Sequence, residues 1–136
     1  KMSKSYNNFI SLREAPASVE EKVRTMQTDP ARVRLTDPGD PSNCPVFALH
    51  EVYSDDAVRD WATQGCQTAG IGCVDCKKPL IDAINAEQSI YRQRAAQFEE
   101  DPDLVNAILQ EGSEKARTIA RETMEDVKDA VGILHR

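Results

Sequence analysis

Residues 77–100 read KKPLIDAINAEQSIYRQRAAQFEE, and this stretch decides the fold class. Its apolar side chains recur with a helical period, at Leu80, Ile81, Ile84, Ile90, Tyr91, Ala95 and Phe98. Such a period predicts one long helix whose apolar face packs against other helices. Aromatic residues make up only 5% of the 136 residues, so aliphatic side chains must build most of the core. The stretch therefore predicts an all-α helical bundle.

The sequence before this helix predicts shorter helices joined by loops. The S-x-x-E string at residues 18–21 is a capping box, which indicates a helix running to about residues 25–27. Residues 28–43 hold three Pro and one Gly and are expected to be mostly loop. Residues 44–53, CPVFALHEVY, favour a helix because Pro45 suits a first turn, and a buried strand is the alternative.

Two acids mark the start of the next predicted helix. Asp55 and Asp56 lie where a helix N-terminus favours negative charge, and this helix is expected to end near Thr63. Residues 64–76, QGCQTAGIGCVDC, then form a Gly-rich loop that leads into the long helix.

The sequence after the long helix predicts two more helices. One begins at Asp101-Pro102, an N-cap followed by Pro in the first turn, and ends at Gly112. The last runs from Ser113 to about Ile133. Its inward-facing side chains are predicted to be Ala116, Ile119, Ala120, Met124, Val127 and Val131.

Charge and hydropathy exclude several classes of protein. The net charge of −6 argues against a protein that coats nucleic acid nonspecifically, so any RNA contact must come from a local basic surface. No apolar run approaches the roughly 20 residues that cross a bilayer, and no signal peptide is present. We expect a cytoplasmic protein without membrane contact. Because the chain begins with Lys1 rather than Met, we read it as the tail of a longer protein.

The first five residues, KMSKS, have the chemistry of a polyphosphate-binding loop. Lysine is a compact, flexible point charge, and serine hydroxyls add hydrogen bonds to phosphate oxygens. Lys1, Met2, Ser3, Lys4 and Ser5 are therefore candidate polyphosphate-binding residues, and the resemblance described below implies that the polyphosphate is ATP. A polar tail without function is the alternative.

The four cysteines have the pattern of a metal site. Cys44, Cys66, Cys73 and Cys76 follow the spacing C-x21-C-x6-C-x2-C. Four thiolates suit tetrahedral zinc or a [4Fe–4S] cluster, and spacing alone does not separate the two. Free thiols or disulfides are the remaining alternative.

Cations on the long helix are candidates for contact with RNA phosphates. Lys77 and Lys78 directly follow the last cysteine, and Arg92 and Arg94 lie further along the same helix. The alternative for each is a solvated surface charge. His50 is expected to be a surface or core histidine, and a neighbour of the metal ligands is the alternative.

These motifs together resemble one enzyme family. KMSKS is the second signature of the class I aminoacyl-tRNA synthetases. The longer strings KMSKSYNN, TDPARVRLTDPGDPSNCPVF, GCVDCKKPL and ILQEGSEKARTIARETM resemble the bacterial tryptophanyl-tRNA synthetases, and the resemblance covers essentially all 136 residues.

The resemblance implies an activity and two domains. Residues 1–15 would be the KMSKS loop and tail of a catalytic domain whose nucleotide-binding sheet and tryptophan pocket are missing from this chain. Lys1 and Lys4 would act catalytically, binding the phosphates of ATP with Mg²⁺ while tryptophan is activated for transfer to tRNA(Trp). Residues 16–136 would be the anticodon-binding domain, which would also contact the catalytic domain. The full-length enzyme would be a homodimer, and this piece alone would be inactive.

The resemblance also favours iron–sulfur over zinc. Some bacterial members carry a [4Fe–4S] cluster on four cysteines with almost this spacing, although their first gap is one residue longer. The alternative function is a stand-alone cluster-binding or zinc-binding module that contacts RNA without catalysis.

Overall fold

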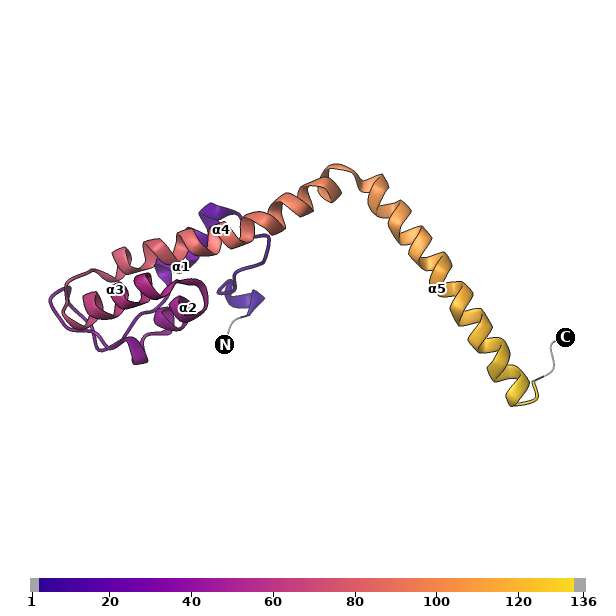
Figure 1. The fold of residues 1–136 in the computed structure, drawn as a ribbon, viewed down its shortest axis with the longest axis horizontal. Coiled ribbons are helices and arrows are strands. Elements are labelled where there is room, and N and C mark those ends of the chain that lie inside the picture. Colours follow the sequence, from indigo (N-terminus) through magenta and orange to yellow (C-terminus); the bar gives the residue numbers. More distant parts are fainter. Residues whose placement is uncertain (1–2, 134–136) are drawn as a thin grey trace. The chain divides into compact units, whose positions relative to one another are not determined.

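The computed structural model describes residues 3–133, and its regular structure is helical (Figure 1). The elements in chain order are the 3-10 helix η1 (Lys4–Tyr6), α1 (Pro16–Thr25), the 3-10 helix η2 (Pro41–Asn43), α2 (Pro45–Tyr53), α3 (Asp56–Gln67), α4 (Cys73–Glu100) and α5 (Pro102–Ala130). No β-strand occurs between residues 3 and 133, so the predicted all-α class is confirmed. Within the same range, no helix combines the length and the apolar character that a bilayer requires.

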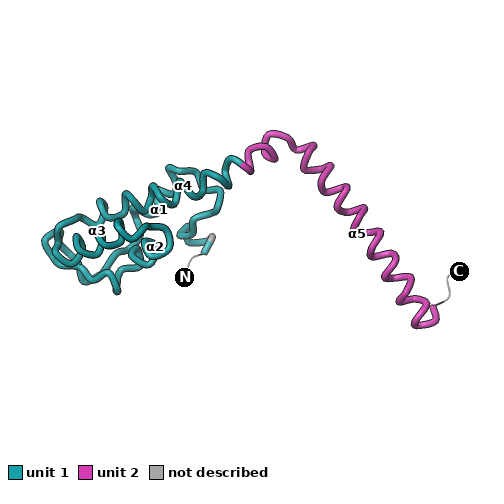
Figure 2. The backbone as a smooth tube through the Cα atoms, viewed as in Figure 1, with its two compact units in different colours: residues 1–93 teal, residues 94–136 magenta. Residues whose placement is uncertain are grey.

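The chain divides into two compact units, residues 1–93 and residues 94–136 (Figure 2). The division falls inside α4, so the first unit holds α1, α2, α3 and most of α4. The predicted boundary after residue 15 is a different division and stays a prediction.

The core of the first unit is aliphatic. Val19, Val23, Val46, Leu80, Ile81 and Ile84 form one buried cluster. They come from α1, α2 and the first half of α4, so the long helix does bury an apolar face. Its later apolar residues differ, since Ile90, Tyr91 and Phe98 are exposed. The helical period therefore predicted the buried positions correctly in the first half of α4 and incorrectly in the second half.

The start of α1 corrects one prediction. The helix begins at Pro16 after Ala15, and its first turn has no side-chain cap. Ser18, predicted as the capping residue, lies inside the helix and donates its hydroxyl to Glu14 Oε1 at 2.6 Å. Pro16 begins the helix earlier because its φ is already helical and it has no N–H to satisfy.

The second and third α-helices match the predictions at their starts. The segment beginning at Pro45 is a helix and not a strand, and Asp55 caps α3 by accepting the Val58 N–H at 2.9 Å. However, α3 continues past Thr63 to Gln67, so the predicted loop shrinks to residues 68–72.

Gly65, which contributed to the predicted loop, lies inside α3 and packs against Ile71. The Ile71 side chain lies on Gly65, where an added Cβ would come within 2.7 Å of Ile71 Cγ1. The Gly65 carbonyl also accepts the N–H groups of Gly70 and Ile71 at 2.8 and 3.2 Å. These contacts outweigh the roughly 1 kcal/mol that a helical glycine costs.

One helix replaces the two predicted at the carboxyl end. Asp101 caps α5 as predicted by accepting the Leu104 N–H at 3.0 Å, but the helix runs through Gly112. Side-chain pairs one turn apart span that glycine, including Lys115 with Glu111 at 2.5 Å. The predicted inward face of residues 116–131 is also wrong, because no residue of α5 is buried.

Candidate functional site

The four cysteines line one small cavity of about 30 Å³ in the first unit. Cys44 precedes α2, Cys66 lies in the last turn of α3, and Cys73 and Cys76 lie in the first turn of α4. Because α4 begins at Cys73, the C-x-x-C pair is on neighbouring positions of one helical turn. All four are free thiols and partly buried, and they form what we call the cysteine cavity.

Burial and the neighbouring sulfurs favour the protonated form of two of these thiols, Cys66 and Cys76. Burial raises the pKa of the Cys76 thiol to about 11, and the other three cysteines add to the effect because neighbouring thiolates would repel one another. Burial also raises the pKa of Cys66, against the lowering effect of the nearby Arg32 guanidinium. Positive charge inside the cavity would favour the thiolate form of Cys66 and Cys76.

Between residues 3 and 133, no three His, Cys, Asp or Glu side chains come together as ligands of one metal ion. The four cysteines instead surround a shared space from three helix ends. The convergence predicted from the sequence is therefore present, while metal binding itself stays a prediction.

The loop before η2 covers the cavity with Arg32 and Gly39. Arg32 Nη1 lies 4.0 Å from Cys66 Sγ, and Nη2 donates to the carbonyls of Ile71 at 2.7 Å and Leu35 at 3.0 Å. Gly39 donates its N–H to the Cys66 carbonyl at 3.0 Å. A Cβ on Gly39 would lie 2.6 Å from Cys66 Sγ, so only glycine fits beside this sulfur.

Asp29 fixes the shape of that loop by accepting hydrogen bonds from its backbone. Its side chain is 5% exposed and accepts the N–H groups of Ala31 at 2.9 Å and Asp40 at 2.8 Å. The Asp40 hydrogen bond is the main cause that lowers the pKa of the Asp29 carboxyl. A charged Asp29 thus ties the two ends of the loop together and holds Arg32 and Gly39 against the cysteine cavity.

His50 is a fully buried histidine that touches a cysteine. Its Nε2 lies 3.1 Å from the Cys76 carbonyl oxygen and 3.5 Å from Cys76 Sγ, and its Nδ1 lies 2.8 Å from Ser54 Oγ. Burial lowers the pKa of His50, so the ring is neutral. Because a carbonyl only accepts, Nε2 carries the proton and Nδ1 accepts from Ser54. His50 is therefore a core histidine, and its contact with Cys76 agrees with the alternative that placed it beside the cysteines.

The KMSKS residues are described only in part. Lys1 and Met2 lie outside the described residues, and of Lys4 only the backbone is described. Ser3 donates its N–H to Asn8 Oδ1 at 2.7 Å, and the hydroxyls of Ser3 and Ser5 lie 2.8 Å apart. The phosphate-binding roles of residues 1–5 therefore stay predictions.

The four candidate RNA-binding cations fall into two kinds. Lys77 is 3% exposed and donates to the carbonyls of Arg24 at 2.8 Å and Met26 at 2.7 Å. Arg92 is half-buried and donates to backbone carbonyls, as described below. Lys78 and Arg94 are exposed on the surface. RNA contact stays a prediction for all four, and exposure favours Lys78 and Arg94.

Comparison with known proteins places the chain in a family. A family described as tRNA synthetases class I (W and Y) matches residues 1–89. The chain is 54% identical over 135 residues to a tryptophan–tRNA ligase of Ralstonia nicotianae, covering 99% of this chain and 34% of that protein. It is 46% identical over 134 residues to a tryptophan–tRNA ligase of Deinococcus radiodurans, covering 98% of this chain and 41% of that protein.

A solved structure agrees with the sequence comparison. The crystal structure of tryptophanyl-tRNA synthetase from Campylobacter jejuni complexed with ADP and tryptophan has a TM-score of 0.82 and 28% identity to this chain. The match covers 98% of this chain and 41% of that chain, so this chain spans well under half the length of its relatives. With the family matched over residues 1–89, the chain belongs to the class I tRNA synthetases of the tryptophan and tyrosine type.

Proposed function

We propose that the chain is part of a tryptophan–tRNA ligase, which activates tryptophan with ATP and transfers it to tRNA(Trp). The observation that carries this proposal is the 54% identity to a tryptophan–tRNA ligase over nearly the whole chain, starting at the KMSKS string. A stand-alone RNA-binding module would have no use for that string, so the enzyme is favoured over the module.

Within that enzyme, Lys1 and Lys4 bind the phosphates of ATP together with Mg²⁺. Tryptophan attacks the α-phosphate through its carboxylate, and pyrophosphate leaves. The two ammonium groups stabilise the negative charge that builds on the leaving pyrophosphate. Met2, Ser3 and Ser5 complete the loop, and the serine hydroxyls donate to phosphate oxygens.

We also propose that Cys44, Cys66, Cys73 and Cys76 hold a [4Fe–4S] cluster. Four thiols around one cavity support this, as does Gly39, which leaves room beside Cys66 that a Cβ would fill. Four thiolates would suit either a cluster or a zinc ion, and the resemblance to bacterial members that carry a [4Fe–4S] cluster favours the cluster. When bound, the cluster links the ends of α2, α3 and α4 through iron–thiolate bonds.

The helical domain contacts the tRNA(Trp) anticodon loop in this proposal. Lys78 and Arg94 are exposed and accessible to phosphates, although Lys78 also pairs with Asp75. Lys77 and Arg92 instead donate hydrogen bonds to backbone carbonyls of the fold. The full-length enzyme works in the cytoplasm as a homodimer, where reducing conditions keep cysteines available as ligands.

The test uses the complete protein, purified without oxygen. We expect tryptophan-dependent exchange of pyrophosphate into ATP, charging of tRNA(Trp), and about four irons per chain with broad absorption near 400 nm. Absence of exchange in an intact, folded protein would overturn the enzyme assignment. A colourless protein with one zinc per chain would overturn the cluster and leave the enzyme in place.

A further inference from the structure

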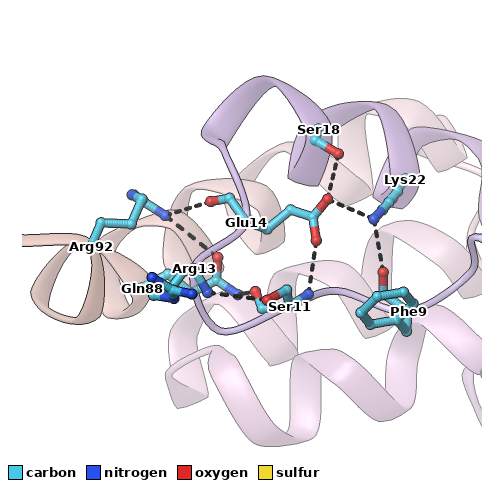
Figure 3. A network of polar contacts seen from close by, with 8 residues as sticks. All are labelled: Phe9, Ser11, Arg13, Glu14, Ser18, Lys22, Gln88 and Arg92. Carbon is cyan, nitrogen blue, oxygen red and sulfur yellow. Dashed lines mark hydrogen bonds and ion pairs between the residues drawn. The ribbon is translucent and has the colours of Figure 1, made fainter. Parts of the chain in front are cut away.

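The segment that follows KMSKS is fixed to the helical unit by polar contacts that the proposed chemistry does not use (Figure 3). We propose that Glu14 is a positioning residue for the KMSKS loop, acting through one network that ties this segment to α1 and α4. The Glu14 network consists of Phe9, Ser11, Arg13, Glu14, Ser18, Lys22, Gln88 and Arg92. This inference rests on the proposed function, because it concerns where the ATP-binding loop is rooted.

The Glu14 carboxylate is bound on both oxygens. Oε1 accepts from Lys22 Nζ and Ser18 Oγ, each at 2.6 Å, and Oε2 accepts the Ser11 N–H at 2.9 Å. The side chains of Glu14 and Lys22 are only 14% and 12% exposed. These bonds lower the pKa of Glu14 to about 2, the largest cause being the Lys22 ammonium, so the carboxylate stays charged at any physiological pH.

Lys22 of α1 binds both ends of residues 9–14. Besides Glu14, its ammonium donates to the Phe9 carbonyl at 2.9 Å and lies 5.1 Å from the centre of the Phe9 ring. Between these two points Ile10 packs against the buried apolar cluster. One ammonium from α1 therefore holds both ends of residues 9–14, with an apolar anchor between them.

The same segment is held from α4 by two further side chains. Gln88, which is 5% exposed, donates to the Ser11 carbonyl at 3.0 Å. Arg92 donates through Nη1 to the Glu14 carbonyl at 3.2 Å and through Nη2 to the Asn85 carbonyl at 2.9 Å. Figure 3 shows Arg92 and Gln88 reaching the segment from the side opposite Lys22. Contacts 77 and 78 residues apart in sequence thus converge on residues 11 and 14.

The KMSKS residues themselves have local hydrogen bonds. Ser3 bonds to Asn8 and to Ser5, and the Tyr6 N–H donates to the Ser3 carbonyl at 3.3 Å. The root of the loop is therefore fixed from Phe9 onward, four residues after Ser5. A loosened root would let the lysines sample more positions, which costs rate in the activation step rather than tryptophan affinity.

The experiment compares three variants of the complete protein in pyrophosphate exchange, which needs no tRNA. Glu14→Gln keeps the shape and removes the charge, and Arg92→Gln removes the contact from α4. Glu111→Gln is the matched control, because Glu111 also pairs with a lysine, at 2.5 Å, but on the exposed surface of α5. We expect kcat to fall about tenfold for Glu14→Gln and Arg92→Gln, KM for tryptophan to stay within about twofold, and Glu111→Gln to match the wild type.

A second measurement separates positioning from misfolding. In hydrogen–deuterium exchange, Glu14→Gln should speed exchange in residues 3–14 while the core helices keep their protection. Unchanged exchange in residues 3–14, or a wild-type kcat in a folded Glu14→Gln variant, overturns the inference. If Arg92→Gln alters only tRNA charging, Arg92 is an RNA contact and its positioning role is overturned. A wild-type protein without pyrophosphate exchange overturns the proposed function instead.

Discussion

The cysteine cavity and the Glu14 network are the two polar centres of the first unit, and they differ in how charge is balanced. In the Glu14 network a carboxylate meets an ammonium at 2.6 Å, and its pKa falls to about 2. In the cysteine cavity four thiols have one guanidinium nearby, and the pKa of Cys76 rises to about 11. The first centre is complete as folded, whereas added positive charge in the second would favour the thiolate form of Cys66 and Cys76. A balanced network is suited to fix geometry, and an unbalanced set of thiols is suited to bind a metal.

Removing one thiol should have the largest effect and tests the unbalanced centre directly. Cys76→Ser is expected to reduce metal affinity by more than about a hundredfold, since even the partners of metal ligands cost 10–100-fold when changed. The protein should lose iron on desalting and unfold at a lower temperature, measured by metal analysis and circular dichroism. Val74→Ser is the control, because Val74 lies between the two ligands in sequence but is exposed. A Cys76→Ser variant that kept its full metal content would show that the two centres do not differ as argued.

Adding one methyl group beside the cavity should have the next largest effect. Gly39→Ala places a Cβ 2.6 Å from Cys66 Sγ and 3.2 Å from Arg32 Cδ. We expect it to lower the free energy of unfolding by about 2 kcal/mol through overpacking and to weaken metal retention, measured by denaturant titration and metal analysis. Gly112→Ala is the matched control, because nothing lies within 4 Å of that position and alanine favours a helix by about 1 kcal/mol. Opposite signs for the two variants are the expected result, and equal effects would contradict the close approach at Gly39.

The sequence predicted those features of the molecule that depend on local signals. Asp55 and Asp101 were found because an N-cap is read within three residues of its own position. The cysteine set was found because thiol spacing is itself a metal-binding pattern, and the structure brings the four residues to one cavity. The Ser18 cap failed because Pro16, two residues earlier, starts the helix.

The rest depended on contacts between distant residues, which no local pattern marks. Arg32 and Gly39 reach Cys66 from a loop about 30 residues away, and only the fold brings them together. Glu14 depends on Arg92, 78 residues later in the chain. The S-x-x-E string at residues 18–21 predicted Ser18 as a helix cap, whereas its hydroxyl donates to Glu14. Composition and periodicity therefore predicted the helices and the ligands but not the groups that position them.

The balanced centre should respond to acid in a defined direction. The pKa of Glu14 falls from 4.5 to about 2 on folding, so its stabilising effect is present above pH 4.5 and is lost as pH falls toward 2. At pH 7 we expect Glu14→Gln to cost about 1.5 kcal/mol of unfolding free energy, a typical value for hydrogen bonds to a charged group. The difference between wild type and variant should shrink between pH 4.5 and 2 in denaturant titrations. A difference that stayed constant over this range would show that the charge of Glu14 contributes nothing.

The smallest effect on stability is expected at Lys78, which is exposed, and it is compared with its neighbour Lys77, which is buried. Lys78 pairs with Asp75 at 2.7 Å, but the two side chains are 66% and 59% exposed, so Lys78→Ala should change stability by less than about 0.5 kcal/mol. Lys77→Met should destabilise more, because it leaves the carbonyls of Arg24 and Met26 without their buried donor.

Binding of tRNA(Trp) at several salt concentrations then separates the two roles. We expect Lys78→Ala to reduce the salt slope by about one, as loss of one phosphate contact does, while Lys77→Met leaves the slope unchanged. The reverse result would mean that Lys77 leaves its carbonyl partners to contact RNA.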